Sequence, residues 1–247
     1  MSMLLEGLAP WPQTDFAEYG AVRSRPLSKI QRLVGSFLGR NWVAIPHVTH
    51  QDEADITEME ARRSAHNDLG GAKLTAVPLL VKAMADGLKA FAQFNASIDA
   101  AQGNLVLKDY VHIGVAVDTP GGLLVPVIRD CDGKSVAQIA AELAAVSEKA
   151  RTKGLSMAEM SGGCMTLSSL GHIGGTGFTP IVNAPEVAIL GVTRAQTVAT
   201  RGQDDSVVWR QMLPLSLSYD HRVINGADAA RFTRYIAGRL ADPALFG

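Results

Sequence analysis

The sequence is poor in cysteine, has no cluster of basic residues and has no long apolar run. Only Cys131 and Cys164 occur in 247 residues, which gives neither a disulfide framework nor metal-binding spacing and favours a reducing compartment. The formal net charge is -1, so we expect no nucleic-acid or anionic-membrane partner, because both need clustered Lys and Arg. No stretch approaches the ~20 apolar residues of a membrane span and the first residues lack the parts of a signal peptide, so we expect a soluble, cytoplasmic protein.

Several motifs of common active sites are missing as well. There is no GxxxxGK[ST] phosphate loop and no GxSxG nucleophile elbow, and the stretch 171–177 is a poor GxGxxG match without a suitably placed acidic residue after it. Neither cysteine has an adjacent base, so we interpret both as small core residues. His47 and His50 have HxxH spacing, but an odd separation in a strand turns side chains to opposite faces, so we expect no metal site.

The apolar residues, 47% of the chain, suffice for a sizeable core, and their spacing predicts helices and strands. A period of three to four residues predicts helices over 28–39, 57–67, 75–91, 135–149, 156–160 and 226–240. We expect Ser28 and Ser135 to cap two of them, and the stretch from Thr57 to Glu60 to form a capping box. A period of two, or a short apolar run, predicts strands over 42–51, 105–118, 123–128, 162–171, 187–192 and 213–220, with a hairpin turn at 120–122.

These elements predict one α/β domain. We expect a mixed sheet packed against helices in two layers (α+β) from about residue 27 to the end of the chain at 247. Residues 1–26 contain proline and glycine among polar residues, and we interpret them as an arm or the remnant of a linker.

One stretch, 213–226, organises the rest of the chain. Its polar residues alternate with apolar ones, which predicts a strand with one buried face, and a helix follows directly. His221 therefore lies at a strand-to-helix corner, with Asp220, Arg222 and Asn225 around it. From the residues alone it is either a catalytic or a structural histidine.

The same stretch carries a resemblance to a known family. Tyr219–Phe232 is similar to the DHRxxxG signature of the catalytic domain of dihydrolipoamide acyltransferases, the E2 cores of 2-oxo acid dehydrogenase complexes. Further segments resemble the family in the expected order: 41–50, 54–60, 93–99, 121–130 and 162–171. The resemblance covers about 27–243, is strongest to the acetyltransferases of bacterial pyruvate dehydrogenases, and implies a fold like that of chloramphenicol acetyltransferase.

The resemblance also implies a reaction and its residues. Family members transfer an acyl group directly between the thiols of dihydrolipoamide and coenzyme A, and His221 matches the general base that a thiol of pKa ~8.5 needs. Ser168 matches the hydroxyl that stabilises the oxyanion, with Ser169, on the opposite face of the strand, as the competing assignment. Many members have aspartate where this chain has Asn225, which can orient a neighbour but carries no charge.

The resemblance further implies an assembly. Active sites of the family lie between the subunits of a homotrimer, so His221 and Ser168 would come from different chains, with coenzyme A and the lipoyl arm entering from opposite sides. Trimers assemble into cubic or dodecahedral cores of roughly 24 or 60 chains, which hold E1 and E3 indirectly. We expect the apolar pair Leu245–Phe246 to dock on a neighbour.

We expect this chain to contain no lipoyl domain and no peripheral-subunit-binding domain, so a lipoyl group would be supplied in trans. Two alternatives stay open at this point. One is an acetyltransferase of the same fold that acts on another small acceptor. The other is a scaffold subunit without activity, against which the presence of His221 argues.

Overall fold

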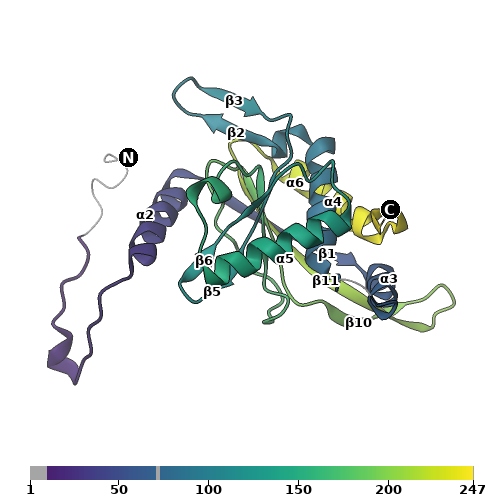
Figure 1. The fold of residues 1–247 in the computed structure, drawn as a ribbon, viewed down its shortest axis with the longest axis horizontal. Coiled ribbons are helices and arrows are strands. Elements are labelled where there is room, and N and C mark those ends of the chain that lie inside the picture. The colour runs from purple at the N-terminus through teal and green to yellow at the C-terminus, as the bar shows by residue number, and fades with distance from the viewer. Residues whose placement is uncertain (1–9, 71–72, 247) are drawn as a thin grey trace.

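The computed structural model describes residues 10–70 and 73–246, and a seven-stranded mixed sheet lies at its centre (Figure 1). The strand order is β1 (His47–Asp55), β11 (Val207–Asp220), β9 (Ala188–Val192), β8 (Met165–Ser169), β4 (Ile113–Val115) and β7 (Val127–Ile128), and β10 (Gln196–Arg201) also pairs with β11. The pairs β4–β8 and β8–β9 are parallel and the others are antiparallel. This confirms the predicted mixed sheet.

Two small ribbons lie outside this sheet. The first pairs β2 (Ala96–Asp99) with β3 (Asn104–Leu107), and the second pairs β5 (Val117–Thr119) with β6 (Gly122–Leu124). The second ribbon is the hairpin predicted around 120–122. The predicted strand 105–118 is therefore divided among three strands, because the chain leaves β3 for the central sheet at β4.

Helices cover one face of the sheet and form the second layer. They are α3 (Thr57–Asp68), α4 (Ala76–Ala90), α5 (Val136–Thr152) and α6 (Gly226–Ala241). Shorter 3-10 turns lie at Ala92–Phe94, Met157–Met160 and Pro243–Phe246, and one more, Phe16–Tyr19, lies in the exposed N-terminal arm. The core between the layers is continuous, and in it the rings of Phe94 and Phe232 stack at 4.1 Å. None of the helices in the described part of the chain has the length and hydropathy needed to cross a bilayer.

Strand β11 departs from the prediction because both of its faces are buried from 213 to 220. The leucines and Tyr219 pack under the helices, as expected. The polar face is covered by the loop between β8 and β9, where the backbone N–H of Phe178 donates to Ser216 Oγ at 3.3 Å. Ser218 Oγ pairs with Thr49 Oγ1 at 2.7 Å. Alternation alone could not reveal this covering loop.

Helix α2 (Lys29–Ala44) begins as predicted but ends five residues later than Gly39. Ser28 caps it, with Gln31 completing a capping box. The predicted strand at 42 was wrong at its start, because Trp42 is still helical and β1 begins at His47. The end of the helix is set by Pro46, since the residue before a proline is driven into an extended conformation.

The apolar face of α2 is largely exposed, and Ile30 lies close to another element, the β5–β6 turn at Gly121 and Gly122. Its five predicted stripe residues are 36–49% exposed: Ile30, Leu33, Val34, Phe37 and Leu38. In Figure 1 the helix projects from the body on the side of the N-terminal arm. The stripe was predicted correctly in sequence, but it does not cover the core of its own chain.

One further local prediction was wrong. The capping box at Thr57 does not form, because the Thr57 hydroxyl donates to Asp55 at 2.6 Å and Glu60 pairs with Arg63 at 2.7 Å. In this single chain Leu245 is buried in the core shared with α4 and α6 and Phe246 is partly buried beside it, so docking of the pair on a neighbour stays a prediction.

Candidate functional site

His221 lies where β11 turns into α6, as predicted, and its side chain is exposed. The corner is held by the backbone. The N–H of His221 donates to the carbonyl of Pro46 at 3.1 Å, and the N–H groups of Val223 and Ile224 both donate to the carbonyl of Asp220 at 3.0 Å. An exposed imidazole on a fixed corner is well placed to accept a proton from a bound molecule.

Asp220 and Arg222 brace this corner from both sides of the histidine. The Asp220 carboxylate is buried and accepts from Arg222 Nη2 at 2.6 Å, from Nε at 2.9 Å and from the backbone N–H of the same residue at 3.0 Å. This contact raises the pKa of the Arg222 guanidinium. Such a bidentate pair fixes the turn in which His221 lies.

Asn225 has a clear structural task. Its side-chain oxygen accepts from the backbone N–H of Asp228 at 2.9 Å and so caps α6. Asparagine is a strong cap residue, and this explains the boundary between corner and helix. Within this chain the side-chain oxygen is therefore engaged on the helix rather than on His221.

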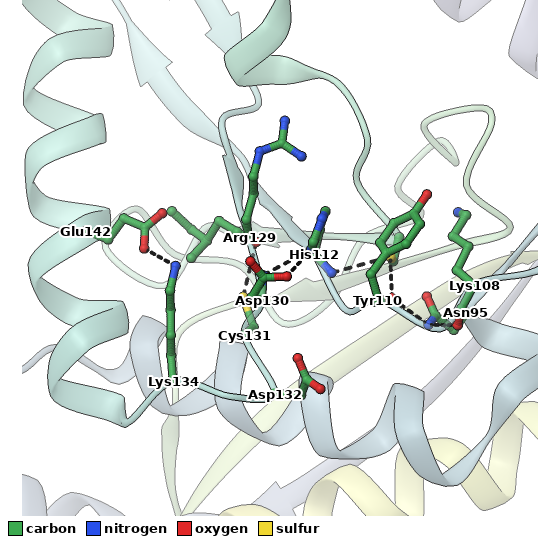
Figure 2. A network of polar contacts seen from close by, with 12 residues as sticks. Asn95, Lys108, Tyr110, His112, Arg129, Asp130, Cys131, Asp132, Lys134 and Glu142 are labelled. Carbon is green, nitrogen blue, oxygen red and sulfur yellow. Dashed lines mark hydrogen bonds and ion pairs between the residues drawn. The ribbon is translucent and has the colours of Figure 1, made fainter.

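Two other histidines are held by partners distant in sequence. His47 Nδ1 contacts the carbonyl of Ile45 at 2.8 Å, and its Nε2 accepts from the N–H of Val182 at 3.0 Å, so both nitrogens are used. His112 Nδ1 accepts from the N–H of Asp130 at 3.0 Å (Figure 2). Sequence reasoning missed these roles because 135 residues separate the first pair and 18 the second.

Ser168 and Ser169 end strand β8 and point to opposite faces of the sheet. Ser169 shares its face with Met165 and Leu167 in the core under the helices, whereas Ser168 shares its face with Thr166. On that second face Ser168 lies opposite Gly191 of β9, which in turn lies opposite Ser216 of β11.

The structure does not bring Ser168 and His221 together in one chain. Ser216 precedes His221 by five residues, and two strand spacings separate Ser168 from Ser216. At ~3.3 Å per residue and ~4.8 Å per strand, the backbones of Ser168 and His221 are roughly 20 Å apart. A single chain therefore presents two halves of a candidate site.

One cavity lies on the helix side, between the start of α4, α5 and β5. It has a volume of about 570 Å³, and its lining includes Lys73, Arg151 and His172 together with Asp118 and Ser169. The start of α4, which has no side-chain cap, contributes Thr75, Val77 and Pro78 to this lining. Positive side chains beside a helix N-terminus suit phosphate groups.

A second cavity of about 550 Å³ shares Thr75, Val77 and Ser169 with the first. Thr193 also lines it, and its hydroxyl is buried without a hydrogen-bond partner among the described residues. The two cavities therefore adjoin, and Lys73 and Arg151 belong to the lining of the first. No group of three or more His, Cys, Asp or Glu side chains arranged to hold a metal ion occurs in residues 10–70 and 73–246.

The two cysteines lie in the core, as interpreted from the sequence. Burial raises the pKa of Cys131 to about 12 and raises the pKa of Cys164 in the same way. A thiol with a raised pKa is a poor nucleophile at neutral pH. Neither cysteine is therefore a candidate for a covalent intermediate.

With this geometry in place, the chain was compared with known proteins. Residues 19–247 match the family of 2-oxoacid dehydrogenases acyltransferase (catalytic domain). Dihydrolipoyllysine-residue acetyltransferase components of pyruvate dehydrogenase complexes are similar: that of Pseudomonas aeruginosa is 54% identical over 239 residues and that of Azotobacter vinelandii 53% over 238. The matches cover 96% and 92% of this chain but 44% and 36% of those proteins. The chain thus spans less than half the length of these relatives.

Solved structures support the same family assignment. A structure of the Azotobacter vinelandii dihydrolipoamide acetyltransferase matches with a TM-score of 0.93 and 52% identity, over 97% of this chain and 100% of that one. It is described as a study of the role of a serine, a histidine and an asparagine in the catalytic mechanism. A structure described as the cubic core of the pyruvate dehydrogenase multienzyme complex has a TM-score of 0.92, also at 52% identity and the same coverage. Chloramphenicol acetyltransferase, 14% identical with a TM-score of 0.60 over 79% of this chain and 89% of that one, shares the fold and confirms the expected architecture.

Proposed function

Because the chain belongs to the family of 2-oxoacid dehydrogenase acyltransferase catalytic domains, we propose that it moves an acetyl group between dihydrolipoamide and coenzyme A. The observation that carries this proposal is the exposed histidine on its braced corner, with Asn225 four residues later. In the description of the Azotobacter enzyme, the histidine and the asparagine are also four positions apart.

The chemistry follows from the side chains. A thiol of pKa ~8.5 is mostly protonated at neutral pH, so His221 accepts its proton as the sulfur attacks the thioester carbonyl. A serine hydroxyl donates to the negative oxygen that develops, which is worth a few kcal/mol. When the carbonyl reforms, the departing sulfur leaves as a thiol after taking the proton back from the imidazolium. No acyl-enzyme is needed.

We assign the oxyanion donor to Ser168. It lies on the polar face of the sheet, together with Ser216, Ser218 and Asp220, whereas Ser169 shares the face of the apolar core. Spacing alone favours Ser169, because the serine and the histidine of the Azotobacter enzyme are 52 positions apart, as Ser169 and His221 are here. The β10–β11 hairpin lies between the serine and the histidine in the chain. One extra residue in a hairpin is readily tolerated and would place Ser168 at the matching position, so we give more weight to the face of the sheet than to the spacing.

We propose that the two halves of the site meet between subunits of a trimer. A separation of roughly 20 Å is too large for side chains to bridge, so His221 of one chain must act with Ser168 of another. The stripe of α2 from Ile30 to Leu38, which is 36–49% exposed in this chain, is an apolar surface that such a contact would bury. For the larger assembly we propose a cubic core, like that in the description of the 52% identical structure.

The two adjoining cavities on the helix side suit coenzyme A. Lys73 and Arg151 of the first would face the phosphates, while the pantetheine arm would reach the end of β8 at Ser169, which lines both cavities. We propose that a lipoyl domain, supplied in trans, approaches from the opposite side, and that E1 and E3 join indirectly. We further propose a cytoplasmic setting, in keeping with the two reduced, buried cysteines.

The test uses two variants that should each be strongly impaired. His221→Ala should lower kcat for acetyl transfer from acetyl-CoA to dihydrolipoamide by about 10²–10⁴, and Ser168→Ala should also lower it. His66→Ala, which removes an exposed histidine of α3, is the matched control and should keep wild-type kcat. A hydroxyl acceptor assayed beside dihydrolipoamide tells whether the acceptor class is right.

Mixing then tests the shared site. If the two variants are unfolded and refolded together, random assembly gives an intact pair of His221 and Ser168 at about a quarter of the interfaces. We expect about that fraction of wild-type activity to return, whereas each variant refolded alone should stay strongly impaired. A mixture no more active than its components would contradict a site built from two chains, and a normal kcat for His221→Ala would contradict the reaction itself.

A further inference from the structure

Glu186 is a buried carboxyl group that the proposed acyl transfer does not use. It lies just before β9 and is only 5% exposed. The hydroxyl of Thr166, in β8, donates to its Oε2 at 2.7 Å, and the side-chain amide of Asn183 donates to its Oε1 at 3.3 Å. Since Thr166 is also buried, the contact is shielded from water and is stronger than a surface hydrogen bond.

Two glycines leave the space that this pair occupies. A Cβ on Gly163 would lie 2.8 Å from Glu186 Oε1, and a Cβ on Gly114 would lie 2.9 Å from the Thr166 hydroxyl oxygen. Both distances are shorter than side-chain carbons tolerate, so any larger residue would push the pair apart. The contact is thus built jointly by β4, the start of β8 and the segment before β9.

The hydrogen bond between Thr166 and Glu186 affects the proposed site because Thr166 lies on the same strand face as Ser168. Thr166 and Ser168 are two residues apart in β8, so their side chains leave the same face of the sheet about 6.6 Å apart. We propose that Glu186 is a positioning residue for Ser168: by holding Thr166, it fixes the end of β8 and the hydroxyl that faces the reacting carbonyl. This inference rests on the proposed function, because it assigns no chemistry of its own to Glu186.

The protonation state of Glu186 should change the strength of its hydrogen bond with Thr166. Burial raises its pKa to about 7, against the hydrogen bonds from Thr166 and Asn183 and the charge of Lys108, which all lower it. The other titratable group that faces it is the thiol of Cys164. The ionised carboxylate accepts both hydrogen bonds, whereas the neutral acid uses one oxygen for its own proton. The hold on Thr166 therefore strengthens as the pH rises through neutrality.

The first test removes the hydroxyl. Thr166→Val should lower kcat about ten- to a hundredfold with KM for coenzyme A nearly unchanged, because a small displacement of the donor is felt in the transition state. Thr166→Ser should restore most of the activity. Thr233→Val is the matched control: Thr233 is fully buried in α6 and donates to the carbonyl of Ala229 at 3.0 Å. It should lose similar stability but keep wild-type kcat.

The second test follows the pH profile of kcat in Glu186→Gln. If activity needs both His221 and Glu186 to lose a proton, log kcat of the wild type should rise with pH on the acid side more steeply than a single ionisation allows. In Glu186→Gln the slope should fall to that of a single ionisation. Superimposable profiles, or a wild-type kcat in Thr166→Val, would show the inference to be wrong while leaving the proposed function standing. If the wild-type chain transfers no acetyl group, both the proposed function and the inference about Glu186 are wrong.

Discussion

Gly191 is the position where adding a single methyl group should test the packing over the polar face of the sheet. It lies in the middle of β9, opposite Ser168 on one side and Ser216 on the other. The ring of Phe178, from the loop that covers this face, sits directly on it. A Cβ added at Gly191 would lie 2.6, 2.7 and 3.2 Å from three atoms of that ring.

The expected cost of Gly191→Ala can be worked from these contacts. Overpacking of this kind typically costs about 1–3 kcal/mol, and the lower entropy of alanine in the unfolded chain returns about 0.5–1 kcal/mol. Displacing Phe178 also weakens its two backbone contacts, the N–H to Ser216 Oγ at 3.3 Å and the carbonyl to Gln51 at 3.4 Å. We expect a net loss of about 1–2 kcal/mol in the free energy of unfolding.

Denaturant unfolding at a fixed protein concentration measures this loss, since assembly would otherwise shift the midpoint. Gly238→Ala is the matched control, because Gly238 is exposed in α6 with nothing within 4 Å of an added Cβ. It should gain up to about 1 kcal/mol from helix propensity. In a Phe178→Ala background the cost of Gly191→Ala should disappear. An unchanged cost in that background would refute the contact as its cause.

Two further predictions concern serine and pH. Ser168→Ala should lower kcat with little change in KM, because the hydroxyl acts mainly in the transition state, and a larger effect of Ser169→Ala in the same assay would reverse our assignment. Glu186 has its pKa raised from 4.5 to about 7 in the folded chain, so its contribution to stability is full below pH 4.5 and is lost as the pH rises to 7. Between pH 4.5 and 7 the free energy of unfolding of the wild type, measured with denaturant, should therefore fall by about 3 kcal/mol relative to that of Glu186→Gln. If the free energies of unfolding of the two proteins changed in parallel with pH, the raised pKa of Glu186 would be wrong.

Features set by neighbouring residues were predictable from the sequence. Ser28 and Ser135 cap their helices with glutamines three residues on, because every atom of a capping box lies within one turn. The corner at His221 was predictable for the same reason, since a change of period from two to nearly four marks it in one short stretch. Thr57 was misassigned because Asp55, two residues before it, competed for its hydroxyl.

Features that depend on distant partners could not be predicted. The tasks of His47 and Glu186 are set by Val182 and Thr166, which reach them only after the sheet has formed. The covering of the polar face by Phe178 likewise depends on a loop whose path no local pattern encodes. Long-range contacts of this kind explain why the sequence could suggest candidate residues but not the groups that hold them.

The proposed division of the site between chains has its physical basis in the sheet. Ser168 and His221 are separated by the register of β8, β9 and β11, in which every pairing is fixed by backbone hydrogen bonds and by a core on the other face. Changing that register by one residue would turn the core leucines outward, so side-chain motion cannot close the gap. A chain with this sheet can acquire a base and an oxyanion donor at one carbonyl only by presenting them to neighbours, which couples the proposed catalysis to assembly.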